Sequence, residues 1–428
     1  MSESDAPNLL VQPLCNTLTN LSRNPYPHVP NPENCKRRAS VAVILRVRPN
    51  YSHWPSDSDV KLVDTTQDSA VHLESFFSQS WVQNGDPETV FIKRATRDGD
   101  RWTGHVALPG GKRDPEDEDD KATAIRETWE EIGLDLTSPD AIFIGNLPER
   151  VVSASWGKVP IMVLCPFVFL WTKPDMPPLR LQPTEVASTH WVPLRILLSP
   201  TVRTYEYVDV SDRFAKQGGF IVRAMLRSVL GMMRFSAMRL IPSESLYSSS
   251  IAEFFSPEKD ERKATLGDRI SKLVYGNQTK EIGVPQPLLL WGLTMGIFCD
   301  MLEQLPPHNA IQLWEYPTFT SPDLRFIINL LTHSLKERNL QRLQDNGVGN
   351  QTAMDMSTEA VDLRTIDGEI GNGKSNGGNN ANRSYAVGIK LDGYYDLARK
   401  GIWITTGIRS AGVVAALVYT IRILRRRN

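Results

Sequence analysis

The stretch Gly110 to Leu134, GGKRDPEDEDDKATAIRETWEEIGL, carries most of the information about this chain's fold and chemistry. It places Glu127, Glu130 and Glu131 at relative positions i, i+3 and i+4. On a helix of about 3.6 residues per turn these positions share one face. Adjacent carboxylates repel one another unless a cation neutralises them, and magnesium or manganese prefers such oxygen ligands. The stretch therefore predicts a helix that holds a divalent metal ion.

Two neighbours of these carboxylates suit the same purpose. Arg126 lies about 100° round the helix from Glu127, so it can brace the carboxylates or a neighbouring loop. The pair Gly110-Gly111 has no side chains, so its backbone can approach a metal ion or a phosphate closely. The acidic run from Asp114 to Asp120 is expected to be a solvated loop.

The stretch resembles the Nudix box, the signature of the Nudix hydrolases. That pattern is Gly, five residues, Glu, seven residues, Arg-Glu, a bulky aliphatic residue, any residue, Glu-Glu, any residue, Gly, and a bulky aliphatic residue. The matching residues are Arg126, Glu127, Glu130, Glu131, Gly133 and Leu134. Counted back from the Arg-Glu pair, Glu118 fills the upstream glutamate place and Gly111 comes one residue too early. We interpret this offset as one extra residue in the loop before the helix. Thr128 replaces the aliphatic residue, which predicts a small loss of packing.

The resemblance implies metal-dependent attack of water on a diphosphate that joins a nucleoside to another group. The implied cofactor is Mg²⁺ or Mn²⁺, and its expected ligands are Glu127, Glu130, Glu131 and a backbone carbonyl near Gly110. The expected catalytic residues are Glu131, Glu127 and Arg126. The general base stays open among Glu118, Glu149 and Glu185.

Within the superfamily, the chain is most similar to the coenzyme A diphosphatases. The similar segments are 109–115 (PGGKRDP), 191–194 (WVPL) and 290–294 (LWGLT). The chain departs from that group at Leu108, where the group has Phe, and at Arg101, which is one residue out of register. Coenzyme A or acyl-coenzyme A is therefore the expected substrate. A dinucleotide or sugar nucleotide remains an alternative, as does a membrane-tethered binding module that keeps the fold without turnover.

The surrounding sequence favours an α/β fold, the α/β/α sandwich of Nudix proteins. Short apolar runs rich in β-branched residues predict strands. These runs are 40–47, 89–94, 141–147, 159–171 and 188–192. A buried helix over 286–302 is expected to close the sandwich.

Changes in composition divide the chain further. The expected parts are a flexible segment 1–37, a hydrolase domain 38–303 with a mostly helical insertion about 204–284, a helical extension 304–345, a disordered Gly/Asn-rich linker 346–385, and an apolar, basic-flanked tail 386–428. The linker contains Gly368 to Ser375, which matches the P-loop pattern. The Gly/Asn-rich residues after it cannot propagate the helix that holds phosphate, so nucleotide binding is not expected there.

Charge, cysteine spacing and the N-terminal sequence argue against a nucleic-acid partner, a cysteine metal site and a signal peptide. The 428 residues include 48 Lys plus Arg and 49 Asp plus Glu, so no nucleic-acid partner is expected. Four cysteines lack metal-ligand spacing and are expected to be free thiols. The N-terminal MSESDAPNLL has no apolar core, which argues against a signal peptide.

Two segments suggest membrane contact. The apolar, cationic stretch 220–241 predicts a helix with Arg223, Arg227 and Arg234 on one stripe, which suits a membrane surface, a partner or simply the domain surface. The stretch 401–424 is apolar and about one span long, with basic residues on both sides. Arg409 opposes insertion by about 2.5–3.5 kcal/mol. We therefore expect either a tail anchor or a helix lying on a membrane or on the protein. An anchor of this kind predicts a cytoplasm-facing enzyme on the mitochondrial outer membrane or the peroxisome.

Overall fold

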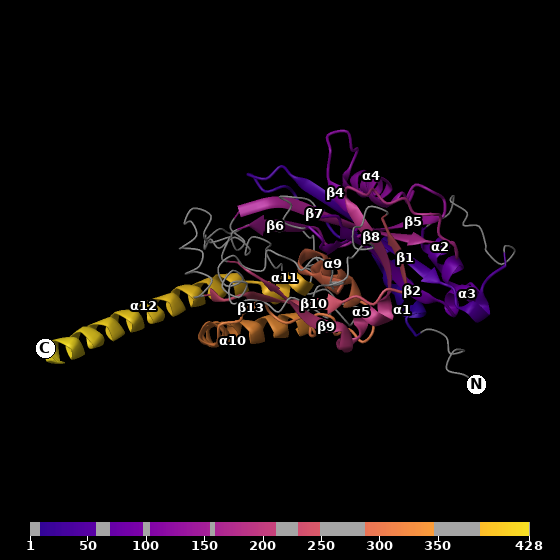
Figure 1. Ribbon diagram of the computed structural model, residues 1–428. Helices are drawn as coiled ribbons and strands as arrows, with labels where there is room; N and C mark the ends of the chain where they lie inside the picture. Colours follow the sequence, from indigo (N-terminus) through magenta and orange to yellow (C-terminus); the bar gives the residue numbers. More distant parts are fainter. Residues whose placement is uncertain are drawn as a thin grey trace, which may run out of the picture.

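The computed structural model describes residues 9–56, 69–96, 103–154, 159–210, 230–248, 287–345 and 386–427. Within these residues, nine strands form one mixed sheet whose main path runs β11-β8-β2-β1-β7-β5 (Figure 1). The strands on this path are β1 (Arg38–Arg48), β2 (Asp86–Arg94), β5 (Ala141–Asn146), β7 (Val159–Trp171), β8 (Val186–Pro193) and β11 (Glu244–Tyr247). Three shorter strands pair with β2, β1 and β7, respectively: β3 (Val106–Ala107), β4 (Gly110–Lys112) and β6 (Arg150–Ala154). The five strands expected from sequence are thus confirmed.

Helices cover both faces of this sheet, which confirms the α/β/α sandwich. On β1, Val43 and Leu45 face one core, whereas Ala42 and Ile44 face the other, because strand side chains alternate. The first core is closed by α1 (Val11–Arg23), α2 (Ser69–Phe77) and α9 (Gly292–Leu302), and the second by α4 (Asp120–Ile132). Shorter helices are α3 (Ser80–Gln83), α5 (Leu194–Leu198), η2 (Tyr51–His53) and η3 (Pro200–Val202).

The prediction that residues 1–37 form a flexible segment is wrong for α1. This helix carries a strongly apolar face, and Leu14 and Leu18 are fully buried on the sheet. Beyond the helix, the backbone carbonyl of Val29 and the side chain of Asn31 accept hydrogen bonds from Arg38 of β1. The described residues of this segment, from Leu9 onward, are therefore part of the fold, because burial of an amphipathic face outweighs the weak helical tendency of the sequence.

The predicted closing helix begins at Gly292 rather than at Gln286. The residues before it, Leu289–Trp291, form strand β12 and pair with β10 (Met233–Arg239). Gly292 has a φ of +65°, a left-handed conformation that favours glycine at this strand-to-helix turn. The rest of the prediction is confirmed, because α9 is buried along most of its length.

The insertion contributes strands where the sequence predicted a helix. Within the described residues, β9 (Arg203–Val208), β10, β12 and β13 (Thr318–Phe319) form a second, four-stranded sheet. The helix predicted over 220–241 is wrong for Met233–Arg239, because pairing with strands on both sides satisfies the backbone there. Arg234 lies against Tyr205 and binds Glu315 at 2.9 Å. Arg223 and Arg227 lie outside the described residues.

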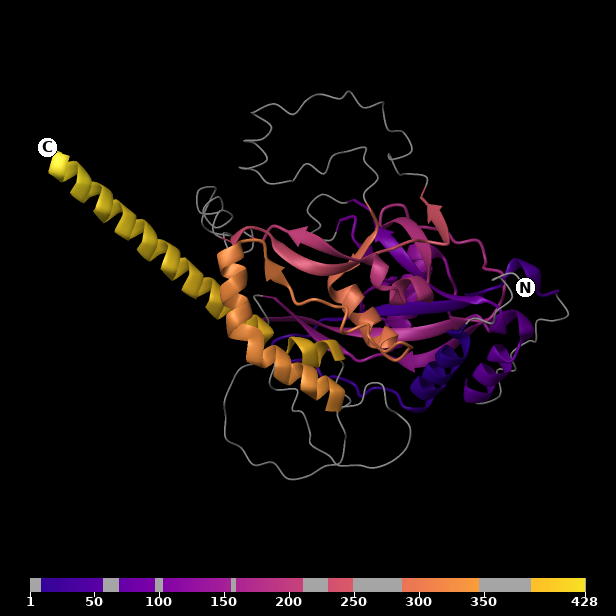
Figure 2. The same cartoon turned by 90° about the horizontal axis from the view of Figure 1, so that it is seen from below.

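Within the described residues, three helices follow the second sheet. The predicted helix over 323–344 is confirmed as α10 (Pro322–Asp345), and α11 (Ala386–Leu391) and α12 (Tyr394–Arg427) come after it. The first half of α12 packs along α10, and the second half projects away from the body (Figures 1 and 2). Among the described helices, the continuous stretch Ala386–Arg426 alone is long and apolar enough to cross a membrane. The predicted disordered linker and the P-loop-like motif lie outside the described residues.

The packing of α1 gives a test of the N-terminal correction. Leu18→Ala should lower the free energy of unfolding by about 2–5 kcal/mol, because it leaves a cavity in the core. The exposed neighbour Asn16 provides the control, since Asn16→Ala should change stability by less than about 0.5 kcal/mol. Urea unfolding measures both variants. Equal stabilities for Leu18→Ala and the unmodified protein would show that α1 does not belong to the fold.

Candidate active site

Local sequence signals fix where helix α4 begins and ends. The Asp119 carboxylate caps the first turn by accepting a hydrogen bond from the Ala122 N–H at 2.7 Å. Gly133 ends the helix in the left-handed conformation, with a φ of +70°, and its N–H donates to the Trp129 carbonyl at 2.9 Å. Inside the helix, the buried Thr128 hydroxyl donates to the Ala124 carbonyl at 2.7 Å, so it is satisfied without an aliphatic side chain.

The carboxylates of Glu127 and Glu131 face the glycine pair of β4. Glu131 is 2% exposed, and its Oε2 accepts the backbone N–H of Gly110 at 2.9 Å. A Cβ atom on Gly111 would come within 2.4 Å of the Glu127 carboxyl group. A Cβ atom on Gly110 would lie 2.2 Å from the carbonyl oxygen of Ser40, and the φ of Gly110 is +145°. Position 110 therefore requires glycine, whereas a side chain at Gly111 would displace the Glu127 carboxylate.

The space where Glu127 and Glu131 face Gly110 and Gly111, the glycine cradle, is unfavourable for two ionised carboxylates without a cation. Burial raises the pKa of Glu131 to about 8, and the neighbouring charges of Glu127 and Glu185 act in the same direction. Burial also raises the pKa of Glu127, against the opposing effect of Arg126. Converging carboxylate oxygens beside an open backbone are a donor set that a hard divalent cation fits.

Glu130, the third predicted metal ligand, is more exposed than Glu127 and Glu131. The side chain of Glu130 is 52% exposed, and its carboxylate pairs with Arg126 Nη1 at 2.9 Å. It thus shares the helix surface with Glu127 and Glu131 but not their burial. The structure brings two of the three glutamates into the glycine cradle and leaves the third at its rim.

Arg126 joins the helix to the preceding loop. Its Nε and Nη2 donate to the two oxygens of Asp117 at 2.8 and 2.9 Å, and Nη2 also reaches the Lys112 carbonyl at 3.2 Å. The guanidinium holds the pKa of Asp117 far below its usual value. Arg126 lies 3.2 Å from Glu127 as well, so it braces the carboxylates as the sequence suggested.

The upstream acidic partner is Asp117, whereas the sequence placed Glu118 there. Glu118 is exposed, and its backbone carbonyl accepts a hydrogen bond from Arg113. Five residues separate Gly111 from Asp117, which is the family spacing, so the extra residue lies between Asp117 and Arg126. The early position of Gly111 was the signal that could have revealed this register.

Glu149 belongs to a different charge cluster. Arg38 binds Asp120 and Glu149, both at 2.7 Å, and His28 lies 3.2 Å from Glu149. Ligand atoms of His28, Asp120 and Glu149 lie within 4.8 Å of one another, but Arg38 and Arg113 already pair with the two carboxylates. Glu149 is thus held by Arg38 in this second cluster.

Two charged residues from other strands act on the cradle. Glu185, just before β8, raises the pKa of both Glu127 and Glu131 through its charge. Arg94, at the end of β2, acts on Glu131 in the opposite direction. Both residues lie far along the chain from the Nudix-box residues 111–134. The sequence therefore could not rank Glu185 among the three candidate bases, and it gave no reason to name Arg94.

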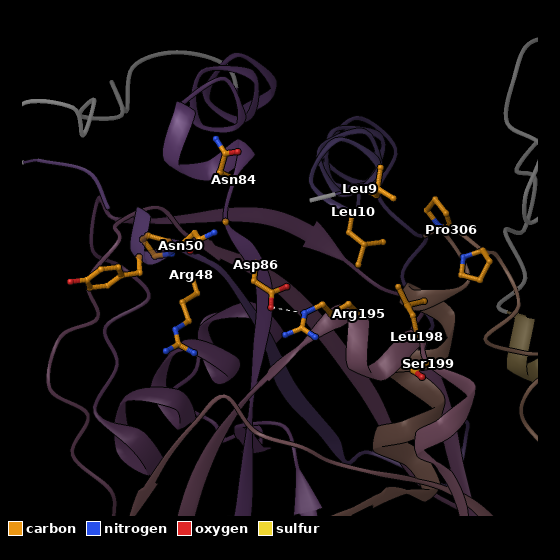
Figure 3. A pocket seen from close by; sticks show the side chains of 14 residues that line it. Leu9, Leu10, Arg48, Asn50, Asn84, Asp86, Arg195, Leu198, Ser199 and Pro306 are labelled. Atoms are coloured by element: carbon orange, nitrogen blue, oxygen red, sulfur yellow. Dashed lines mark hydrogen bonds and ion pairs between the residues drawn. The ribbon is translucent and has the colours of Figure 1, made fainter. Parts of the chain in front are cut away.

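A cleft of about 990 Å³ lies elsewhere (Figure 3). Arg48, Tyr51 and Arg195 line it, with Arg195 paired to Asp86 at 2.8 Å. It opens beyond the C-terminal end of β1, whereas β4 pairs with residues 39–41 near the other end. About seven residues of strand, roughly 23 Å, separate the two places. This cleft is therefore distinct from the glycine cradle.

The chain is similar to proteins of one known family. The family model described as NUDIX domain matches residues 80–210. The uncharacterized protein C14C4.10c of Schizosaccharomyces pombe is 33% identical over 299 residues, which cover 68% of this chain and 79% of that protein. The peroxisomal coenzyme A diphosphatase ndx-8 of Caenorhabditis elegans is 36% identical over 26% of this chain and 43% of its own length. The mitochondrial coenzyme A diphosphatase NUDT8 of mouse is 46% identical over 12% and 25%, respectively. The chain thus spans less than half the length of these two diphosphatases.

The pairing of Arg126 predicts unequal effects at two neighbouring carboxylates. Asp117→Asn should lower hydrolytic turnover about 10- to 100-fold, as loss of a residue that supports a metal ligand usually does. Glu118→Gln should leave turnover close to that of the unmodified protein, because this side chain is exposed. The measurement is the steady-state rate of diphosphate hydrolysis. The opposite ranking would restore Glu118 as the upstream acidic residue.

Proposed function

This chain belongs to the Nudix superfamily and is a Nudix hydrolase, and we propose that its substrate is coenzyme A or acyl-coenzyme A. The reaction would cleave the diphosphate linkage with the help of Mg²⁺ or Mn²⁺. The observation that carries the proposal is the placement of Glu127 and Glu131 against Gly110 and Gly111. Nudix hydrolases generally use divalent metal ions, and this donor set suits one.

The proposed roles follow from these positions. Glu127 and Glu131 would hold the metal ions together with a backbone carbonyl near Gly110, and Glu130 would complete the set from the rim. A divalent ion there polarises the diphosphate and acidifies the attacking water. Arg126 fixes the direction of the carboxylates through Asp117. The absence of side chains at the glycine pair lets the diphosphate approach the backbone.

Glu185 is the proposed general base. Its charge acts on Glu127 and Glu131, whereas Glu118 is exposed and Glu149 is bound by Arg38. A base must lie within hydrogen-bond reach of the water that it deprotonates, and the electrostatic effect of Glu185 on both cradle carboxylates supports such a position.

Coenzyme A as the substrate is supported by the segments that resemble its diphosphatases. The segment 290–294 spans β12 and α9, and its Trp291 ring packs against His105, with centroids 5.0 Å apart. His105 directly precedes β3, which leads into the glycine pair. Segment 290–294 thus lies against the residues that lead into segment 109–115, which supports one substrate site shared by the two segments.

Two alternatives remain as outcomes of a substrate assay. Hydrolysis of a dinucleotide or sugar nucleotide in preference to coenzyme A would keep the reaction and change the substrate. Binding without turnover would support the membrane-tethered module, although the chain retains all three box glutamates. The compartments of ndx-8 and NUDT8 favour the peroxisome or mitochondrion as the location, and fluorescence microscopy of the tagged full chain tests this.

The first test concerns Glu131. Glu131→Gln should lower turnover by at least about a hundredfold, because it neutralises a metal ligand. Mn²⁺ should raise the Tm of the unmodified protein but not that of the variant, since binding to the folded state stabilises it. The metal-free variant should be no less stable, because it removes a buried charge. Full turnover in the variant on every substrate would exclude the box as the active site.

The second test concerns the base. Glu185→Gln should reduce kcat about 10²- to 10⁴-fold with little change in KM, and should alter the acidic limb of the pH–rate profile. The exposed Glu116 offers a matched control, because Glu116→Gln removes the same charge on the solvated loop. An unchanged pH profile in Glu185→Gln would assign the proton transfer to another group.

A further inference from the structure

Helix α12 consists of a packed half and a bare half. In the packed half, Tyr394, Ala398 and Thr405 are buried, and a Cβ atom on Gly401 would come within 2.8 Å of Ile328 on α10. From Ala411 to Arg422, every residue is exposed. Both views show this half as a straight continuation that leaves the body (Figures 1 and 2).

An ion pair marks the boundary between the two halves. Arg409 Nε donates to Asp323 Oδ2 at 2.7 Å, and Nη2 binds the other carboxylate oxygen. Asp323 lies in the first turn of α10. The arginine that opposes membrane insertion in the sequence is therefore matched by a carboxylate of the folded body.

The bare half is apolar without a polar stripe. Between Ser410 and Arg422 it has no charged residue, and the Thr420 hydroxyl donates to the Ala416 carbonyl within the helix. Its large exposed side chains are Val413, Val414, Leu417, Val418, Tyr419 and Ile421. A protein groove would cover one side only, whereas lipid surrounds a helix on all sides. Arginines 422, 425 and 426 beyond this stretch suit anionic headgroups.

The packed half is joined firmly to the hydrolase sheet. Asp300 of α9 binds Arg150 of β6 at 2.6 Å and accepts the Val387 N–H of α11 at 3.0 Å. At the turn before α12, Asp392 pairs with Arg342 of α10 at 3.0 Å. These contacts leave no loose segment between α11 and Arg409.

We propose that residues 410–424 insert into a lipid bilayer and that the Arg409–Asp323 pair sets the depth of insertion, so that the hydrolase domain is held at a fixed height above the membrane. The inserted stretch measures about 22 Å, less than the roughly 30 Å of a hydrocarbon core. The arginines at its end reach the headgroups by extending their side chains. Trp403, exposed on α12 before the boundary, is a residue type enriched at the membrane interface. This proposal does not depend on the substrate.

Attachment is tested with the full-length protein and phosphatidylcholine vesicles with or without phosphatidylserine. The protein should sediment with the vesicles and stay bound in carbonate. The double substitution Val414→Asp with Leu417→Asp should abolish this, while the control Gln341→Asp, on an exposed position of α10, should not. Hydrolysis and Tm of each variant establish folding. Release of the unmodified protein by carbonate, or carbonate-resistant binding of the double variant to the vesicles, would contradict insertion.

Depth is tested with single-cysteine labels, because all four native cysteines are buried. Nitroxides at Ile404→Cys and Ile408→Cys should stay accessible to a water-soluble relaxant on vesicles, and those at Val414→Cys and Val418→Cys should be protected. Adding Arg409→Leu should make the label at 408 protected, because it removes the charge that opposes insertion at the boundary. Protection at 404 in the unmodified background, or no shift at 408 after Arg409→Leu, would overturn the proposed depth setting.

Discussion

The buried contact between the Glu131 carboxylate and the Gly110 N–H is the constraint on which the site depends. It requires α4 to lie across β4 in one register, which the Asp119 cap and the left-handed Gly133 maintain. It also requires glycine at residue 110, because a side chain would collide with β1. The resulting cradle holds carboxylates that burial makes costly to ionise, and a divalent cation removes that cost. One hydrogen bond therefore connects the packing of α4 on β4 with the position of the carboxylate proposed to bind metal.

Arginine–carboxylate pairs connect this site to the rest of the molecule. Arg126 ties α4 to its loop, Arg38 ties β1 to the start of α4, and Arg150 ties the main sheet to α9. The last two pairs join elements far apart in the sequence, and both are buried. Loss of one partner from a buried pair leaves an uncompensated charge, so such pairs fix the relative positions of the elements that they join.

Sequence predicted the parts that depend on local periodicity. The box helix, the strands and α10 follow from spacing and β-branched runs, because those patterns already match the burial that each element needs. Prediction from the sequence failed where contacts between residues distant along the chain determine the structure. The spacing from Gly111 favours Asp117 and the spacing from Arg126 favours Glu118, and the hydrogen bonds of Arg126 decide between them. Met233–Arg239 is a strand because partners lie on both sides. Glu185 and Arg94 become site residues only through the pairing of β2 with β8.

The most direct measurement of the central claim is anomalous diffraction from crystals soaked in Mn²⁺, recorded near the manganese absorption edge. The account predicts anomalous density within coordination distance of Glu127 and Glu131, beside Gly110 and Gly111, and its loss in Glu131→Gln. Density among His28, Asp120 and Glu149 instead, with none at the glycine cradle in crystals of active protein, would contradict it.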